Sequence, residues 1–143
     1  MTPALAVLTS AAALAGCGGS DASSPAQQAK AASVSNQQRG IIGTVDALQA
    51  ASRKGDGQRI CADIFTVHLV HSIETAAKHS CATEVEDRLF TSKTEISVGR
   101  DIQVSGARGS AVVREQNGNV SKLMLLKKAG EWRIDRVVAQ PSP

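Results

Sequence analysis

The chain has 143 residues, which is enough for one ordinary domain with its own core. Hydrophobic residues make up 42% of it and charged residues 20%, which excludes disorder over the whole chain. The net charge of +3 is too small to indicate nucleic-acid binding without a concentrated basic patch. Aromatic residues make up 2% and tyrosine is absent, so the core must be built from Val, Ile, Leu and Ala.

Charge is unevenly divided along the chain. Residues 1–87 carry six basic and eight acidic side chains, whereas residues 88–143 carry ten and five. The basic second half is compatible with an anionic membrane or an acidic partner, but a basic solvated sheet face is the simpler interpretation.

The N-terminus combines an apolar run with a single cysteine. Residues 4–15 are mostly small or aliphatic, and the run is too short for a transmembrane helix, which needs about 20 residues. It is typical of the apolar core of a signal peptide. The segment Leu14-Ala15-Gly16-Cys17 resembles the lipobox of bacterial lipoproteins. The resemblance implies cleavage before Cys17 and lipidation of its sulfur, which would anchor the protein to the bacterial cell membrane in an extracytoplasmic location.

The sequence divides into four segments. Residues 1–16 are expected to be a lipoprotein signal peptide, and residues 17–27, rich in Gly and Ser, a lipid-anchored flexible linker. Residues 28–139 are expected to form the folded domain. Residues 140–143, which end in Pro-Ser-Pro, are expected to be a disordered tail.

Two further cysteines, Cys61 and Cys81, make an even number in a chain expected to be exported. A structural disulfide between them is the natural prediction, and it would contribute about 3 kcal/mol in the chain-entropy model. Two independent buried thiols remain an alternative. A redox pair is a third, although the spacing lacks the compact Cys-x-x-Cys arrangement that tunes thiol reactivity.

The first half of the chain predicts helices with explicit ends. A helix over residues 27–54 carries an apolar stripe and ends at Gly55-Asp56-Gly57. Asp56, Thr66 and Ser80 can each cap the helical segment that follows it. The expected buried positions are Ile41, Val45, Leu48 and Ala51 in the first helix, Ile60, Cys61 and Ile64 in the second, Val67, Val70 and Ile73 after Thr66, and Cys81, Val85 and Leu89 after Ser80.

After Phe90 the hydrophobic period changes to two, which predicts strands. The segments are "EISVGRDIQVSG", with a bulge expected at Gly99, then "SAVVRE", "VSKLMLLKK" and "EWRIDRVV". Asn117-Gly118 and Ala129-Gly130 are expected to form hairpin turns, giving an antiparallel meander. In the last strand Trp132, Ile134 and Val138 are expected on one face, and Arg133 and Asp135 on the other.

Helices followed by antiparallel strands indicate an α+β fold with the helices packed on one side of a curved sheet. The order resembles the nuclear transport factor 2-like superfamily, the cone-shaped cystatin-like fold of ketosteroid isomerase and SnoaL-like cyclases. The resemblance rests on "VDALQAASRKGDGQRICADIF" and on "KLMLLKKAGEWRIDRV". The cysteines of "RICADIF" and "HSCATEVEDRL" are similar to those of small bacterial lipoproteins that carry this domain.

Catalytic residues are not evident in the sequence. The isomerases of this superfamily use a tyrosine with a buried acid, and this chain has no tyrosine. An Asp/His pair could abstract a proton, because histidine titrates near neutral pH and a carboxylate can fix its tautomer. However, His68, His71 and His79 lie in the helical stretch rather than in the strands that usually line the pocket.

A metal site is not expected either. His68, His71 and Glu74 could share one helix face, but a zinc-binding helix uses His at i and i+4. This pattern is typical of a solvated helix face, and we expect neither a metal nor a cofactor.

The sequence therefore predicts a lipid-anchored, extracytoplasmic binding or accessory domain, without catalysis, for a small apolar ligand or an envelope protein. One alternative is an enzyme of the cyclase, isomerase or dehydratase kind, which needs an ionisable pair directed into a dry cavity. Another is a homodimeric module assembled through the sheet. In that case "KLMLL" would place Leu123 and Leu125 on one face and Met124 and Leu126 on the other, leaving no polar side.

Overall fold

The computed structural model describes residues 25–141. The predictions for residues 1–16 and for Cys17 lie outside this range, as do the rest of the linker up to residue 24 and the last two residues of the tail. No helix within residues 25–141 is both long enough and apolar enough to cross a membrane.

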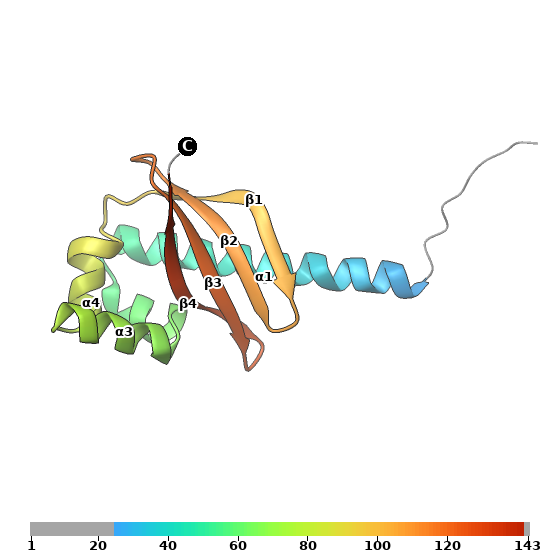
Figure 1. Ribbon diagram of the computed structural model, residues 1–143, viewed down its shortest axis with the longest axis horizontal. Coiled ribbons are helices and arrows are strands. Elements are labelled where there is room, and N and C mark those ends of the chain that lie inside the picture. The colour runs from blue at the N-terminus through green and yellow to red at the C-terminus, as the bar shows by residue number, and fades with distance from the viewer. Residues whose placement is uncertain (1–24, 142–143) are drawn as a thin grey trace, which may run out of the picture.

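The first helix, α1 (Pro25–Lys54), extends past one edge of the sheet at its N-terminal end and crosses the sheet with the remainder (Figure 1). The predicted stripe is confirmed, because Ile41, Val45, Leu48 and Ala51 are all buried. The helix ends where predicted, since Gly55 adopts a positive φ of 63° and no residue with a side chain adopts it easily.

Two short α-helical segments each continue into a π-helical turn. The first pair is α2 (Gly57–Arg59) with η1 (Ile60–Ile64), and the second is α4 (Cys81–Glu84) with η2 (Val85–Leu89). Between them lies α3 (Val67–Ala77). The three predicted caps are confirmed: the side chains of Asp56, Thr66 and Ser80 accept hydrogen bonds from backbone N–H groups at the starts of α2, α3 and α4.

Two predicted core positions in the helices are wrong. Val67 is 83% exposed, because it directly follows the cap of α3, and Leu69 is buried instead. Leu89 is 41% exposed, since the wider π-helical turn of η2 rotates it off the stripe of Cys81 and Val85.

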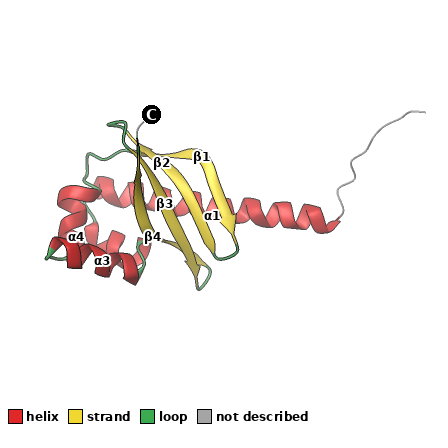
Figure 2. Cartoon of the chain, in the orientation of Figure 1, coloured by secondary structure: helices red, strands yellow, loops and turns green. Residues whose placement is uncertain are grey.

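The sheet has four antiparallel strands in chain order, so the fold is α+β with a curved, open sheet (Figure 2). The strands are β1 (Ile96–Ser105), β2 (Arg108–Glu115), β3 (Val120–Lys128) and β4 (Glu131–Gln140). The predicted bulge is confirmed, because the register of β1 against β2 shifts between Val98 and Ile102, on either side of Gly99. Beyond β4, Phe65 makes a parallel bridge to Ile134.

Of the two predicted hairpin turns, one agrees with the prediction and the other is longer than predicted. Ala129 and Gly130 both have positive φ and join paired residues Lys128 and Glu131, as expected for a two-residue hairpin. At Asn117-Gly118 only the glycine has a positive φ. The N–H of Glu115 donates to the carbonyl of Asn119 at 2.8 Å, so this loop has three residues instead of the predicted two.

A second bulge, in β4, was not predicted and changes the faces of this strand. Leu125 pairs with Ile134 but Met124 pairs with Arg136, which leaves Asp135 as an extra residue. Beyond the bulge Val137 pairs with buried Leu123. The placement of Val138 with Trp132 and Ile134 is therefore wrong.

The core lies between the helices and the concave face of the sheet. It consists of Ile41, Val45, Leu48, Ala51, Ile60, Ile64, Phe65, Leu69, Cys81, Val85, Phe90, Ala111, Val113, Leu123, Leu125, Trp132 and Ile134. As expected from the composition, most of these residues are aliphatic.

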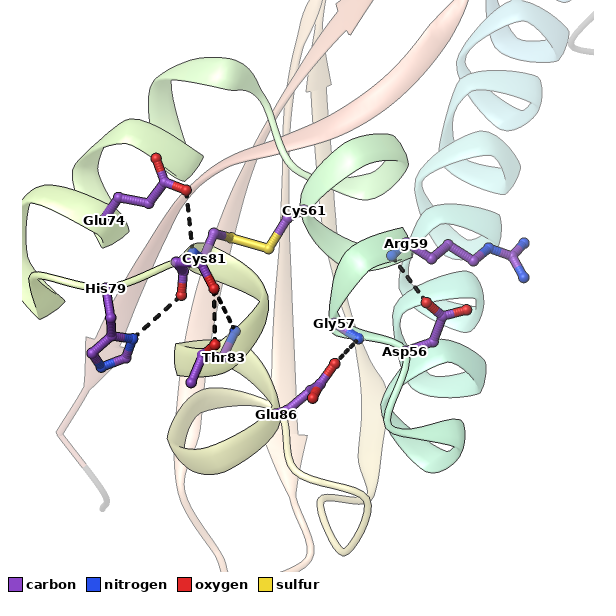
Figure 3. Close-up of a disulfide and its surroundings, with 10 residues drawn as sticks. Asp56, Gly57, Arg59, Cys61, Glu74, His79, Cys81, Thr83 and Glu86 are labelled. Atoms are coloured by element: carbon purple, nitrogen blue, oxygen red, sulfur yellow. Dashed lines mark hydrogen bonds between the residues drawn. A yellow bond between two sulfur atoms is a disulfide. The ribbon is translucent and has the colours of Figure 1, made fainter.

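A disulfide between Cys61 and Cys81 joins η1 to α4 (Figure 3). This agrees with the predicted pairing, and the two Cα atoms are 6.2 Å apart. Two hydrogen bonds connect the neighbouring helical segments. The N–H of Gly57 in α2 donates to Glu86 in η2 at 2.9 Å, and the N–H of Cys81 in α4 donates to Glu74 in α3 at 3.3 Å.

Candidate functional site

A pocket of about 660 Å³ lies between α3, η2 and one end of the concave sheet face. We call this end of the face, formed by Ile96, Val113, Ser121, Leu123 and Val137, the open end. We call it open because these residues, together with residues of α3 and η2, surround a space that no side chain fills.

The other end of the concave face, which we call the covered end, is filled by α1. Its members are Gly109, Leu125 and Trp132, and Ile41 of α1 packs against them. A Cβ atom on Gly109 would lie 2.5 Å from the Cδ1 atom of Ile41, so only a glycine allows this contact. The hydroxyl of Thr44 donates to the carbonyl of Trp132 at 3.1 Å and ties α1 to β4.

The floor of the pocket is apolar. Phe65 and Phe90 meet edge to face with ring centroids 6.1 Å apart, and Leu69, Val113 and Leu123 complete the buried surface beneath the cavity. This floor would accommodate an apolar group, because its side chains are already withheld from water.

The rim of the pocket is polar and carries both signs of charge. Arg88, Glu115 and Asn119 line it, together with Asn117. The amides of Asn117 and Asn119 donate to the carboxylate of Glu115 at 3.0 and 3.4 Å, which orders the β2–β3 loop over one side of the opening. Arg88 is exposed, and its Nε atom lies 3.8 Å from Glu84.

An Asp/His pair also lies at this rim. The Nδ1 atom of His68 is 3.5 Å from Asp135 Oδ1, and the hydroxyl of Thr66 donates to the same oxygen at 2.7 Å. Thr66 also accepts the N–H of Leu69, so one buried hydroxyl caps α3 and orients Asp135. The side chain of Asp135 is 20% exposed and that of His68 is 64% exposed.

From the sequence, Asp135 is one of several charged sheet residues that could line a pocket mouth, but no pattern singles it out, and His68 is expected on a helix away from the pocket. The β4 bulge moves Asp135 out of its expected place beside Arg133, and α3 brings His68 to it. A bulge without a glycine leaves no local signal, and the contact joins residues that are far apart in the chain. Only knowledge of which residues distant in the sequence come into contact could have identified this pair.

The histidines and acids of α3 do not assemble a metal site. Within the described part of the chain, no three His, Cys, Asp or Glu side chains are grouped to hold a metal ion. His68 is directed to Asp135, Glu74 accepts the N–H of Cys81, and His79 lies 3.1 Å from Glu84.

Comparison with known proteins supports the fold. No family model and no curated protein matches this sequence. A crystal structure of a nuclear transport factor 2-like protein of unknown function from Shewanella baltica is similar, with a TM-score of 0.52. The match covers 75% of this chain and 96% of that one at 18% sequence identity. The chain therefore has the nuclear transport factor 2-like fold, and at this identity the likeness concerns the fold alone.

Proposed function

We propose that this protein is a lipid-anchored, extracytoplasmic binding domain of the bacterial cell envelope, and that its pocket holds a small ligand with an apolar body and a polar end. The observation that carries the proposal is the pocket at the open end, with its buried apolar floor and its rim of charged and amide side chains. Pockets of this size and composition are typical of small-molecule sites.

Two features support the proposed location. The disulfide between Cys61 and Cys81 is of the kind that persists in an oxidising compartment, and the lipobox-like segment before Cys17 provides a route of export and anchoring.

Binding without turnover is favoured by the exposure of the rim. His68 is largely open to water, so a proton acceptor at this position would act in a high dielectric, where electrostatic stabilisation of a charged intermediate is weak. The floor is formed by buried apolar side chains such as Phe65, Leu69, Phe90 and Leu123, none of which can accept a proton.

Filling the pocket tests the binding proposal. The probe is anilinonaphthalene sulfonate, which has an apolar body and an anionic end, and its affinity is measured by titration calorimetry. Ser72 is exposed on the pocket side of α3, and Thr75 is exposed on the same helix without lining the pocket. We expect Ser72→Trp to weaken binding at least tenfold, or about 1.4 kcal/mol, and Thr75→Trp to leave it unchanged. Equal affinities of all three proteins would contradict the proposal.

The anchor has a separate test. We expect the chain expressed in a bacterial host to gain the mass of a lipid group and to enter the detergent phase, and we expect both properties to be absent from Cys17→Ser. Identical masses and identical partitioning of wild type and Cys17→Ser would refute lipidation while leaving the pocket untouched.

A second candidate is an enzyme that removes a carbon-bound proton, and the contact between His68 and Asp135 favours it. A ligand recovered from the purified protein would be returned to it in deuterated water and analysed by mass spectrometry. Deuterium uptake that disappears in His68→Gln would support proton abstraction. A ligand that gains no deuterium with the wild-type protein would count against it.

A further inference from the structure

The sheet has a second face, which lies opposite the core and which we call the outer face. The strands cross in front of α1 (Figure 2), and the side chains that pack on the helices alternate with those that point away. The strand register defines the outer face by rows of paired residues across β2, β3 and β4. The rows are Arg114, Val120 and Gln140; Val112, Lys122 and Val138; Ser110, Met124 and Arg136; and Arg108, Leu126 and Arg133.

Each row combines at least one basic residue with an apolar one. Arg108, Arg114 and Arg136 are exposed, and Lys122 is half-buried. Arg136, which lies beside the β4 bulge, also lines the pocket at the open end. None of these four makes an ion pair with another described residue. Glu131, at the β3–β4 turn, is a carboxylate near this face, and it lies 3.7 Å from Arg133.

The apolar members of the outer face are aliphatic and only partly exposed. Met124 and Val138 are each 38% exposed, and Val112 and Leu126 are half-buried. The three aromatic residues of the chain are all buried in the core, so the outer face carries none of them.

This composition disfavours a second copy of the chain as the occupant. Pairing two outer faces would bring like charges from every row together in an interface of low dielectric. The composition also disfavours a protein partner, because protein interfaces draw most of their affinity from aromatic anchors and pockets, and the outer face has no aromatic side chain to offer.

We propose that the outer face docks onto a membrane surface that contains anionic lipid. Long basic side chains can reach phosphate groups with their charged ends while their methylene stems lie beside apolar neighbours such as Met124 and Val138. Each Lys or Arg near an anionic surface strengthens binding by about fivefold. The contact does not depend on the lipid anchor, but it would add the second signal that stable attachment with few acyl chains requires.

Flotation with lipid vesicles tests the proposal on the full chain carrying Cys17→Ser, which removes the anchor. Vesicles of phosphatidylcholine are compared with vesicles that also contain phosphatidylglycerol. The outer-face variant carries Arg108→Gln, Arg114→Gln, Lys122→Gln and Arg136→Gln. A control variant loses the same charge away from the outer face, through Arg53→Gln, Lys54→Gln and Arg59→Gln in the helices and Lys93→Gln in the loop before β1.

We expect the parent and the control variant to gain affinity when phosphatidylglycerol is present, and to lose that gain at high salt. We expect the affinity of the outer-face variant for vesicles with phosphatidylglycerol to be lower than that of the parent by about a hundredfold or more. Absence of a phosphatidylglycerol-dependent gain in the parent, or equal losses in the two variants, would overturn the proposal. Self-association of the parent that is abolished in the outer-face variant, measured by sedimentation equilibrium, would assign the face to a second copy and overturn it as well.

Discussion

The two ends of the concave face have opposite relations to the helices. At the covered end, Ile41 of α1 fits against Gly109 so closely that a single added methyl group would collide with it. At the open end, α3 and η2 stand off from the strands and leave a pocket. The same sheet is therefore packed differently at its two ends: α1 lies directly on the covered end, whereas a pocket remains above the buried side chains of the open end, where we propose that a ligand binds.

The largest expected effect comes from removing a buried leucine at the covered end. Leu125 is buried opposite Ile134, so Leu125→Ala should lower the free energy of unfolding by about 2–5 kcal/mol through lost transfer energy and a cavity. Leu89→Ala, at a partly exposed position beside the pocket, should cost less than about 1 kcal/mol, because Leu89 is already partly hydrated. Urea denaturation measures both, and equal costs would contradict the close packing of the strand residue Leu125 beneath the helices.

A smaller effect is expected from crowding the covered end. In Gly109→Ala the new Cβ would lie 2.5 Å from Ile41 and 3.2 Å from Trp132, so these side chains must shift. Overpacking of this kind costs about 1–3 kcal/mol of unfolding free energy. Thermal unfolding of Gly109→Ala should show a clear decrease in Tm, and an unchanged Tm would mean that α1 does not press on the sheet as closely as described.

Thr66 connects the start of α3 to Asp135 at the rim of the pocket. Thr66→Val removes the hydroxyl that caps the helix and donates to Asp135, and it should cost about 1–2 kcal/mol of unfolding free energy. Thr66→Ser keeps the hydroxyl and should recover most of this loss. Urea denaturation of both variants is the measurement, and a Thr66→Ser protein as unstable as Thr66→Val would show that the methyl group matters instead.

The smallest effect has the opposite sign. Gly43 lies in the middle of α1 with nothing within 4 Å of the position a Cβ would occupy. Gly43→Ala should therefore raise the free energy of unfolding by about 0.5–1 kcal/mol, because alanine loses less backbone entropy in a helix. A decrease in Tm would indicate that something packs on this side of α1.

The parts of the fold that the sequence could predict are those with local causes. The caps at Asp56 and Ser80 and the helix end at Gly55 depend on residues a few positions apart, and the hairpin at Ala129-Gly130 depends on backbone conformation at two positions. Each of these agrees with the structure, as does the order of helices and strands.

The candidate site could not be predicted in the same way, because it depends on distant contacts. The bulge at Asp135 follows from how β4 pairs with β3, and no glycine or proline marks it in the sequence. The bulge decides that Val137 lies on the pocket side and that Asp135 meets His68. Periodicity alone placed Val138 on the face of Trp132 and Ile134, which is wrong because an extra residue reverses the alternation of a strand.

A crystal structure of the full chain carrying Cys17→Ser with anilinonaphthalene sulfonate bound would test ligand binding at the open end. We expect electron density for the probe there, with its rings against Phe65 and Phe90 and its sulfonate at the polar rim. A second, shallower groove at the covered end is lined by Gly40, Thr44 and Trp132. Density for the probe in this groove, with the open end free of it, would contradict ligand binding at the open end.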